Sequence, residues 1–157
     1  MPPVPPPGGA ELGLPLLLQS AADWFNDALI DAIEGRGWPR LSRSQSLVFV
    51  SIDPDGTRPA ELARRLGITR QSMQELLVKL EEHELITVEP DRLDGRANVV
   101  RLAPRAAELG SDAAMVTAAL ERELTDRIGR RDVGSLRRIV GRRWGPPPNV
   151  EDQSIPR

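Results

Sequence analysis

The chain has 157 residues, of which 39% are hydrophobic, 28% charged and 3% aromatic, and its formal net charge is −2. This length suits one domain whose core is built mainly from aliphatic side chains. The lack of cysteine excludes disulfides, iron–sulfur clusters and cysteine-ligated zinc. The net charge gives no chain-wide attraction to nucleic acid, so affinity for an acidic partner has to come from local arrangement.

The first residues, MPPVPPPGGA, are rich in proline and glycine and predict a flexible tail over residues 1–13. The apolar run LGLPLLLQSAA follows no positively charged region and continues directly into DWFNDALIDAIE, so we interpret it as mature sequence rather than a secretion signal. No apolar run is long enough to span a bilayer. We therefore expect a cytoplasmic protein with no membrane partner.

Two helices are expected in the first third of the chain. Residues 15–34 carry apolar side chains at spacings of three and four, which predicts an amphipathic helix that ends at Gly35. Ser42 and Gln45 form a capping-box pattern, so a second, mostly buried helix is expected to begin there. The turn residues DPDG, at 53–56, end it.

The next segment predicts two helices joined by a tight turn. PAELARRL begins at Pro59, Gly67 suits its end, and Thr69 suits the start of RQSMQELLVKLEEH. A short glycine-containing turn between two helices is typical of a helix-turn-helix. The second helix has an apolar stripe for the core, formed by Met73, Leu76, Leu77 and Leu80. Its outward face is formed by Gln71, Gln74, Glu75 and Val78.

The β-rich segments LITVE and ANVVRL are separated by PDRLDGR and predict a hairpin with a long loop. A long helix from residue 104 to about 129 and a shorter one from about 132 to 143 follow, then a polar tail at 145–157. The predicted fold class is mostly α with a small β-hairpin wing. It is a winged helix-turn-helix flanked by additional helices at both ends.

This order of elements resembles the MarR family of bacterial transcriptional regulators, most clearly in RPAELARRLGITRQSMQELLVKLEEHELI and DRLDGRANVVRLAPRAAEL. The resemblance implies a ligand-responsive repressor that binds double-stranded DNA as a homodimer. The operator would be a palindrome with half-sites about 10 base pairs apart. The implied divisions are one domain at 14–144, dimerisation helices at 14–35 and 104–144, and a DNA-binding lobe at 42–103.

The outward face of the second helix is the predicted reading face for a major groove. Gln71 and Gln74 match the adenine N6 and N7 groups, although an exposed polar face needs no DNA to explain it. Glu75 either accepts from cytosine N4 or is a solvated glutamate. At the start of the helix, we expect DNA phosphates to be contacted by Thr69, Arg70 and Ser72.

The loop DRLDGR allows three interpretations, namely a cation site, a hairpin tip or an arm that reaches an acidic partner. Its oxygen ligands do not have the spacing of a calcium loop, so we predict no metal and no cofactor. Asp94 and Gly95 have turn chemistry. The resemblance implies that Arg96 enters the minor groove, that Asp94 orients it and that Arg92 lies at the tip, whereas a solvated loop arginine is the alternative.

The resemblance also implies a small-molecule effector site between the dimerisation helices and the DNA-binding lobe. Glu84 stands where a glycine usually ends the helix in this family, so the turn before the wing is expected to be either strained or differently shaped. The five side chains that are candidates for lining the effector site are either pocket lining or ordinary core. The pocket candidates are Trp24, Phe25, Trp38, Arg40 and Phe49.

Two other functions compete with DNA binding. A winged helix can be a protein-interaction module, and near-neutral charge with Glu75 on the reading face favours that alternative. An enzyme is not expected, because the sole histidine, His83, lies among glutamates and is predicted to be at the surface. No nucleophile, base and orienting group can be assembled around it.

Overall fold

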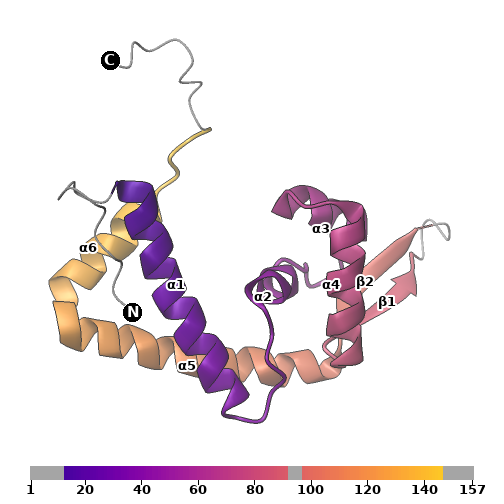
Figure 1. Cartoon of the computed structure of the whole chain (residues 1–157), viewed down its shortest axis with the longest axis horizontal. Coiled ribbons are helices and arrows are strands. Elements are labelled where there is room, and N and C mark those ends of the chain that lie inside the picture. Colours follow the sequence, from indigo (N-terminus) through magenta and orange to yellow (C-terminus); the bar gives the residue numbers. More distant parts are fainter. Residues whose placement is uncertain (1–12, 92–96, 147–157) are drawn as a thin grey trace, which may run out of the picture. The chain divides into compact units, whose positions relative to one another are not determined.

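The computed structural model describes residues 13–91 and 97–146, which form six helices and a two-stranded sheet. The chain divides into two compact units, residues 1–120 and 121–157. The mostly α fold with one hairpin agrees with the prediction. The elements are α1 (Leu14–Glu34), α2 (Arg43–Val50), α3 (Pro59–Leu66), α4 (Arg70–Glu82), β1 (Ile86–Pro90), β2 (Asn98–Leu102), α5 (Pro104–Ile128) and α6 (Arg130–Val140) (Figure 1).

The start of α2 is fixed by the predicted capping box. The backbone N–H of Gln45 donates to Ser42 Oγ at 3.2 Å, and the backbone N–H of Ser42 donates to Gln45 Oε1 at 2.7 Å. The expectation that α2 is mostly buried is wrong, since Leu47 and Val50 are 55% and 73% exposed. The helix has only 8 residues, of which Gln45 and Val48 are buried, and its packing against α3 and α4 leaves Leu47 and Val50 largely exposed.

The buried side of α4 forms part of the core of the first unit. The apolar stripe predicted for this helix is buried at Met73, Leu77 and Leu80, while Leu76 is half-buried. This stripe packs against α2, α3 and β1. Burial of one side of α4 turns its opposite side to solvent, as the sequence predicted.

The hairpin is antiparallel, with register from Ile86 opposite Leu102 to Pro90 opposite Asn98. Thr57, in the α2–α3 connection, extends it by an isolated bridge to Val100, with both backbone hydrogen bonds at 2.9 Å. Val100 is fully buried. The strands are therefore anchored both to the core and to the segment that precedes the helix-turn-helix.

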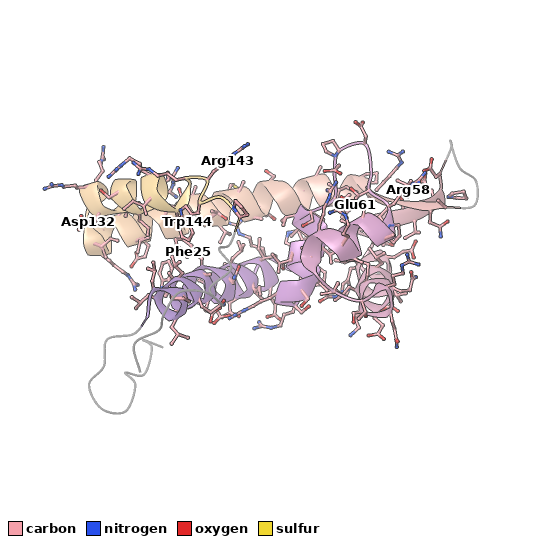
Figure 2. All side chains as sticks on the ribbon, turned by 90° about the horizontal axis from the view of Figure 1, so that it is seen from above. Phe25, Arg58, Glu61, Asp132, Arg143 and Trp144 are labelled. Atoms are coloured by element: carbon pink, nitrogen blue, oxygen red, sulfur yellow. The ribbon has the colours of Figure 1, made fainter. Side chains whose placement is uncertain are left out.

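The described part of the second unit contains the end of α5 and all of α6. The predicted short helix, at about 132–143, instead spans Arg130–Val140. Arg137 bonds Glu121 at 2.7 Å, and Trp144 Nε1 donates to the carbonyl of Ile139 at 3.2 Å (Trp144 is labelled in Figure 2). Within the described residues, no helix is long and apolar enough to cross a membrane.

Candidate nucleic-acid interface

The turn between α3 and α4 sets the direction of the second helix. Gly67 ends α3 in the left-handed conformation, with φ 66°, and Ile68 N donates to the carbonyl of Ala63 at 3.1 Å. Thr69 then caps α4, its Oγ accepting from Ser72 N at 3.1 Å. Both residues do what the sequence predicted, because glycine tolerates positive φ and threonine satisfies a free N–H at the helix start.

The outward face of α4 is polar and exposed. Gln71, Gln74, Glu75 and Val78 are all exposed, as predicted. Gln71 Nε2 donates to Glu75 Oε1 at 3.3 Å, so two of the candidate base contacts touch each other. At the helix start, Thr69, Arg70 and Ser72 are exposed too. All six candidate residues of α4 and its cap thus lie on accessible surface.

Two shallow grooves flank the start of α4. One runs between α4, the start of α3 and the beginning of β2, and the other lies along α3. Both grooves include Arg58 and Arg70, and Arg64 joins the second. The first groove is lined by Arg58, Pro59, Ala60, Arg70, Gln74, Ala97 and Asn98. Guanidinium groups beside a helix N-terminus are suited to phosphate oxygens.

Arg58 also holds the base of the hairpin loop. Its Nε and Nη2 donate to Asp91 Oδ2 at 2.9 and 2.6 Å, and the Asp91 side chain is only 12% exposed. Asp91 N donates to the carbonyl of Ala97 at 2.8 Å, which closes the loop at its two ends. Figure 2 shows Arg58 beside the hairpin. Sequence reasoning missed this pair, because 33 residues separate its members.

Comparisons with known proteins find one family model that matches this region. Residues 41–97 match the model of the MarR family. Over this segment the chain is similar to that family. No curated protein matched the chain by sequence.

Solved structures of MarR-family regulators share the fold over most of the chain. The reduced form of MarR from E. coli is 19% identical, with a TM-score of 0.72, over 84% of this chain and 96% of that chain. CouR, a transcriptional repressor bound to a 23-mer DNA duplex, is 22% identical, with a TM-score of 0.66, over 84% and 97%. A mutant MepR from S. aureus bound to an oligodeoxyribonucleotide is 16% identical, with a TM-score of 0.58, over 83% and 95%.

The wing residues of the MarR-like motif have no described position. Arg92, Asp94 and Arg96 fall at 92–96, outside the described residues, so their predicted roles stay predictions. The described ends of the loop show a role for the motif's first aspartate instead, since Asp91 bonds Arg58. The groove lined by Gln74, Ala97 and Asn98 places the base of the wing next to the predicted reading face.

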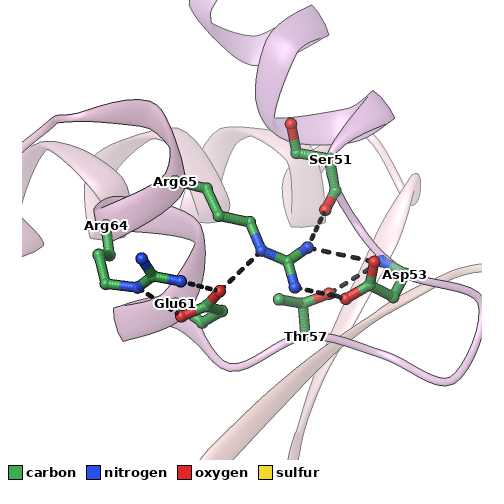
Figure 3. Close-up of polar contacts among 6 residues, drawn as sticks. All are labelled: Ser51, Asp53, Thr57, Glu61, Arg64 and Arg65. Atoms are coloured by element: carbon green, nitrogen blue, oxygen red, sulfur yellow. Dashed lines mark hydrogen bonds and ion pairs between the residues drawn. The ribbon is translucent and has the colours of Figure 1, made fainter. Parts of the chain in front are cut away.

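A cluster of ion pairs fixes the first helix of the motif, α3, to the α2–α3 connection (Figure 3). Arg65 donates to Asp53 at 2.9 and 3.1 Å and to Glu61 at 2.9 Å, while Arg64 donates to Glu61 at 2.7 and 2.9 Å. These bonds, first from Arg64 and then from Arg65, lower the pKa of Glu61 to about 2. Arg65 likewise lowers the pKa of Asp53, with help from the Thr57 hydroxyl.

An apolar cavity of about 90 Å³ lies within the first unit, between α1, α2 and α5. Of the five predicted pocket residues, only Phe49 lines it. The wall consists of Asn26, Leu29, Ile30, Ile33, Pro39, Leu41, Arg43, Ser46, Phe49, Val50, Leu109 and Ala113. Sequence reasoning selected aromatic side chains, whereas this wall is mainly aliphatic.

The other four pocket candidates have partners elsewhere. Trp24 and Phe25 pack edge to face, with ring centroids 4.8 Å apart. Trp38 Nε1 donates to Asp112 at 2.7 Å, and the Arg105 guanidinium lies 5.1 Å from the centre of the Trp38 ring. Arg40 forms ion pairs with two carboxylates of α1, those of Asp31 and Glu34.

His83 is the one histidine of the sequence and lies directly after α4. His83 is half-buried rather than fully exposed, and its carbonyl accepts from Arg105 at 3.3 Å. Within residues 13–91 and 97–146, no three His, Cys, Asp or Glu side chains are grouped so as to hold a metal ion. Of the neighbours named above, CouR is described as a transcriptional repressor.

Proposed function

We propose that this chain is a sequence-specific DNA-binding transcriptional regulator whose α4 enters the major groove of its operator. The observation that carries the proposal is the exposed outward face of α4, with Gln71 and Gln74 on it, beside grooves lined by Arg58 and Arg70. Amide side chains on such a face match adenine, and guanidinium groups around it match the flanking phosphates. A regulator of this kind acts in the cytoplasm, on the chromosome.

Local charge favours an approach of α4 to DNA by its N-terminal end, although the whole chain is slightly acidic. The start of α4 carries Arg70 and the positive end of the helix dipole, whereas Glu81 and Glu82 lie in its last turn. The helix is therefore polarised along its length. A duplex would be approached by the N-terminal end first, with Thr69 and Ser72 on the phosphates.

The wing is assigned to the adjacent minor groove. The Arg58–Asp91 ion pair and the Asp91–Ala97 hydrogen bond restrain the loop where it leaves the hairpin. A restrained base reduces the conformational entropy that Arg96 loses on binding. A narrow A·T-rich groove has the negative potential that attracts this guanidinium.

A homodimer is the expected binding form, and its two-fold symmetry requires a palindromic operator. Exposed apolar side chains on the terminal helices support the dimer, because such surface is usually covered by a partner. In α1 these are Leu14, Leu16 and Leu17. In the second unit they are Ile128, Leu136, Ile139, Val140 and Trp144.

An effector that releases DNA is the regulatory part of the proposal. The cavity between α1, α2 and α5 has about 90 Å³ of space, which suits a small apolar molecule. Its wall includes Phe49 and Val50 of α2. A molecule bound there would bias α2, which packs on both helices of the helix-turn-helix, so DNA affinity would fall if DNA favours the unliganded arrangement.

The proposal is tested by fluorescence anisotropy with intergenic DNA upstream of the chain's own gene, at several salt concentrations. Binding should weaken steeply with salt, and light scattering should give a dimer. Arg70→Ala should weaken binding to all sequences, with a smaller salt dependence, whereas Gln74→Ala should relax preference at one position. Arg36→Ala, in the exposed turn after α1, is the matched control and should bind normally.

Chromatography on heparin or calf-thymus DNA separates the two leading functions. A protein-interaction module would show negligible retention on heparin or calf-thymus DNA at low salt. Arg96→Ala tests the wing by itself, with an expected loss of roughly 1–3 kcal/mol in operator binding and unchanged folding. An unchanged affinity would remove the wing from the mechanism without removing α4.

A further inference from the structure

We propose that Gln71 and Glu75 read two neighbouring base pairs as a coupled unit, in which Glu75 selects cytosine and holds Gln71 in the orientation that selects adenine. This inference rests on the proposed function, since it assigns the base preference of the same face of α4. Both side chains are exposed, and they lie four positions apart on one side of the helix.

The hydrogen bond between them fixes which atoms remain for DNA. A carboxylate only accepts, so the amide nitrogen of Gln71, not its oxygen, must face Glu75, and Nε2 donates to Oε1 at 3.3 Å. Gln71 keeps its amide oxygen and its second N–H. Adenine presents the N6 amino group and the N7 acceptor in the major groove, which is the complementary pair.

Glu75 has the opposite requirement, because a carboxylate offers acceptors alone. In the major groove only cytosine N4 and adenine N6 are donors, whereas guanine and thymine present acceptor oxygens that would repel it. The adenine donor lies beside the N7 acceptor, so a second carboxylate oxygen would meet repulsion there. Cytosine is therefore the base that Glu75 selects.

The electrostatic setting of Glu75 determines whether this side chain favours or opposes DNA binding. In the described part of the chain, its polar partner is the amide of Gln71 rather than a cationic group. Its negative charge is thus not locally compensated by an ion pair on a face that would approach phosphates. Without a donor from the DNA, this carboxylate would only weaken binding. With cytosine opposite, it becomes a source of discrimination.

The two contacts are predicted to be non-additive. Glu75→Gln keeps an acceptor for Gln71, because the amide of the new residue still has a carbonyl oxygen, but it removes the charge. Glu75→Ala removes the acceptor and lets the Gln71 amide rotate. The first variant should therefore change one base position, and the second should relax two.

The test is in vitro site selection with the full chain as wild type, Glu75→Gln, Glu75→Ala and Gln71→Ala. Glu82→Gln, a loss of the same charge at an exposed position in the last turn of α4, is the control and should select the wild-type motif. Wild type should select adenine beside cytosine in each half-site. Replacing that cytosine should weaken wild-type binding about tenfold in anisotropy and leave Glu75→Gln nearly unaffected.

The outcomes separate this inference from the proposed function. No enriched motif with wild type contradicts sequence-specific DNA binding itself. A wild-type motif that Glu75→Gln reproduces unchanged, cytosine included, overturns cytosine selection while DNA binding stands. Relaxation of a single position in Glu75→Ala overturns the coupling. Tighter binding of Glu75→Gln to random DNA, together with lost cytosine preference, supports the inference, since one phosphate-repelling charge is gone.

Discussion

The turns that end α3 and α4 share one backbone geometry but place different residues in it. After α3, Gly67 has φ 66°, its N–H bonds the carbonyl of Arg64 at 3.4 Å, and Ile68 N–H bonds that of Ala63 at 3.1 Å. This pair of bonds is a Schellman motif. Glycine adopts it without strain because it has no Cβ, so local chemistry alone satisfies the end of α3.

After α4 the corresponding residue is Glu84, with φ 59°. The same two bonds form, from Glu84 to the carbonyl of Glu81 at 2.8 Å and from Leu85 to that of Leu80 at 3.0 Å. A non-glycine residue costs roughly 1–2 kcal/mol in this conformation. Leu80 and Leu85 are both fully buried, and their packing offsets the cost. One helix end is thus held by its glycine and the other by the core.

The largest expected effect comes from breaking the packing that holds the second turn. Leu85→Ala should lower the free energy of unfolding by about 2–5 kcal/mol, because it removes a fully buried side chain beside the strained residue. Urea unfolding followed by circular dichroism measures this change. Leu47→Ala is the control, since Leu47 is 55% exposed and should cost well under 1 kcal/mol. Equal losses would mean that burial of Leu85 does not sustain the turn.

Gly67→Ala tests the first turn and should destabilise the fold by about 1–2 kcal/mol. Apart from Gly67 itself and its two chain neighbours, no heavy atom lies within 4 Å of the Cβ that alanine would add, so the loss would report backbone strain rather than a clash. Gly110→Ala is the matched control, because Gly110 lies inside α5 with equally open space. That substitution should stabilise by up to about 1 kcal/mol through helix propensity. The same sign for both would refute the strain argument.

Sequence reasoning succeeded where short-range chemistry decides the structure. Ser42, Gly67 and Thr69 mark helix ends that the structure has at the expected places, and the strain at Glu84 is one of the two outcomes that the sequence predicts for the turn before the wing. It failed where contacts between distant segments decide. The exposure of α2, the Arg58–Asp91 ion pair and the aliphatic wall of the cavity depend on which surfaces meet, and no local pattern encodes that.

Glu84→Gly gives the second turn a glycine at the position where the first turn has one, and it should stabilise the fold by about 0.5–1 kcal/mol. Release of strain contributes roughly 1–2 kcal/mol, and the greater flexibility of glycine in the unfolded chain takes back part of it. The ion pair with Arg105 is 3.6 Å long and solvent-exposed, so its loss costs little. Glu84→Ala separates the two contributions, because alanine keeps the strain and should not stabilise.

The smallest expected effect concerns the ion pairs of Glu61 in α3, the helix that precedes both turns. Hydrogen bonds from Arg64 and Arg65 lower the pKa of Glu61 from 4.5 to about 2. Because the folded pKa lies below the unfolded one, this carboxylate stabilises the fold above pH 4.5, and the stabilisation is lost as the pH falls toward 2. The urea midpoint should therefore decline more steeply over this range in wild type than in Glu61→Gln.

The acid range also separates charge from backbone strain. Glu61→Gln should be less stable than wild type at neutral pH, and the difference should close as the pH approaches 2, because wild type then carries the protonated acid. The effect of Gly67→Ala involves no titrating group at its own site and should stay constant over the range in which both proteins remain folded. A Glu61→Gln difference that persists at pH 2 would show that the ion pairs of Figure 3 contribute by packing rather than by charge.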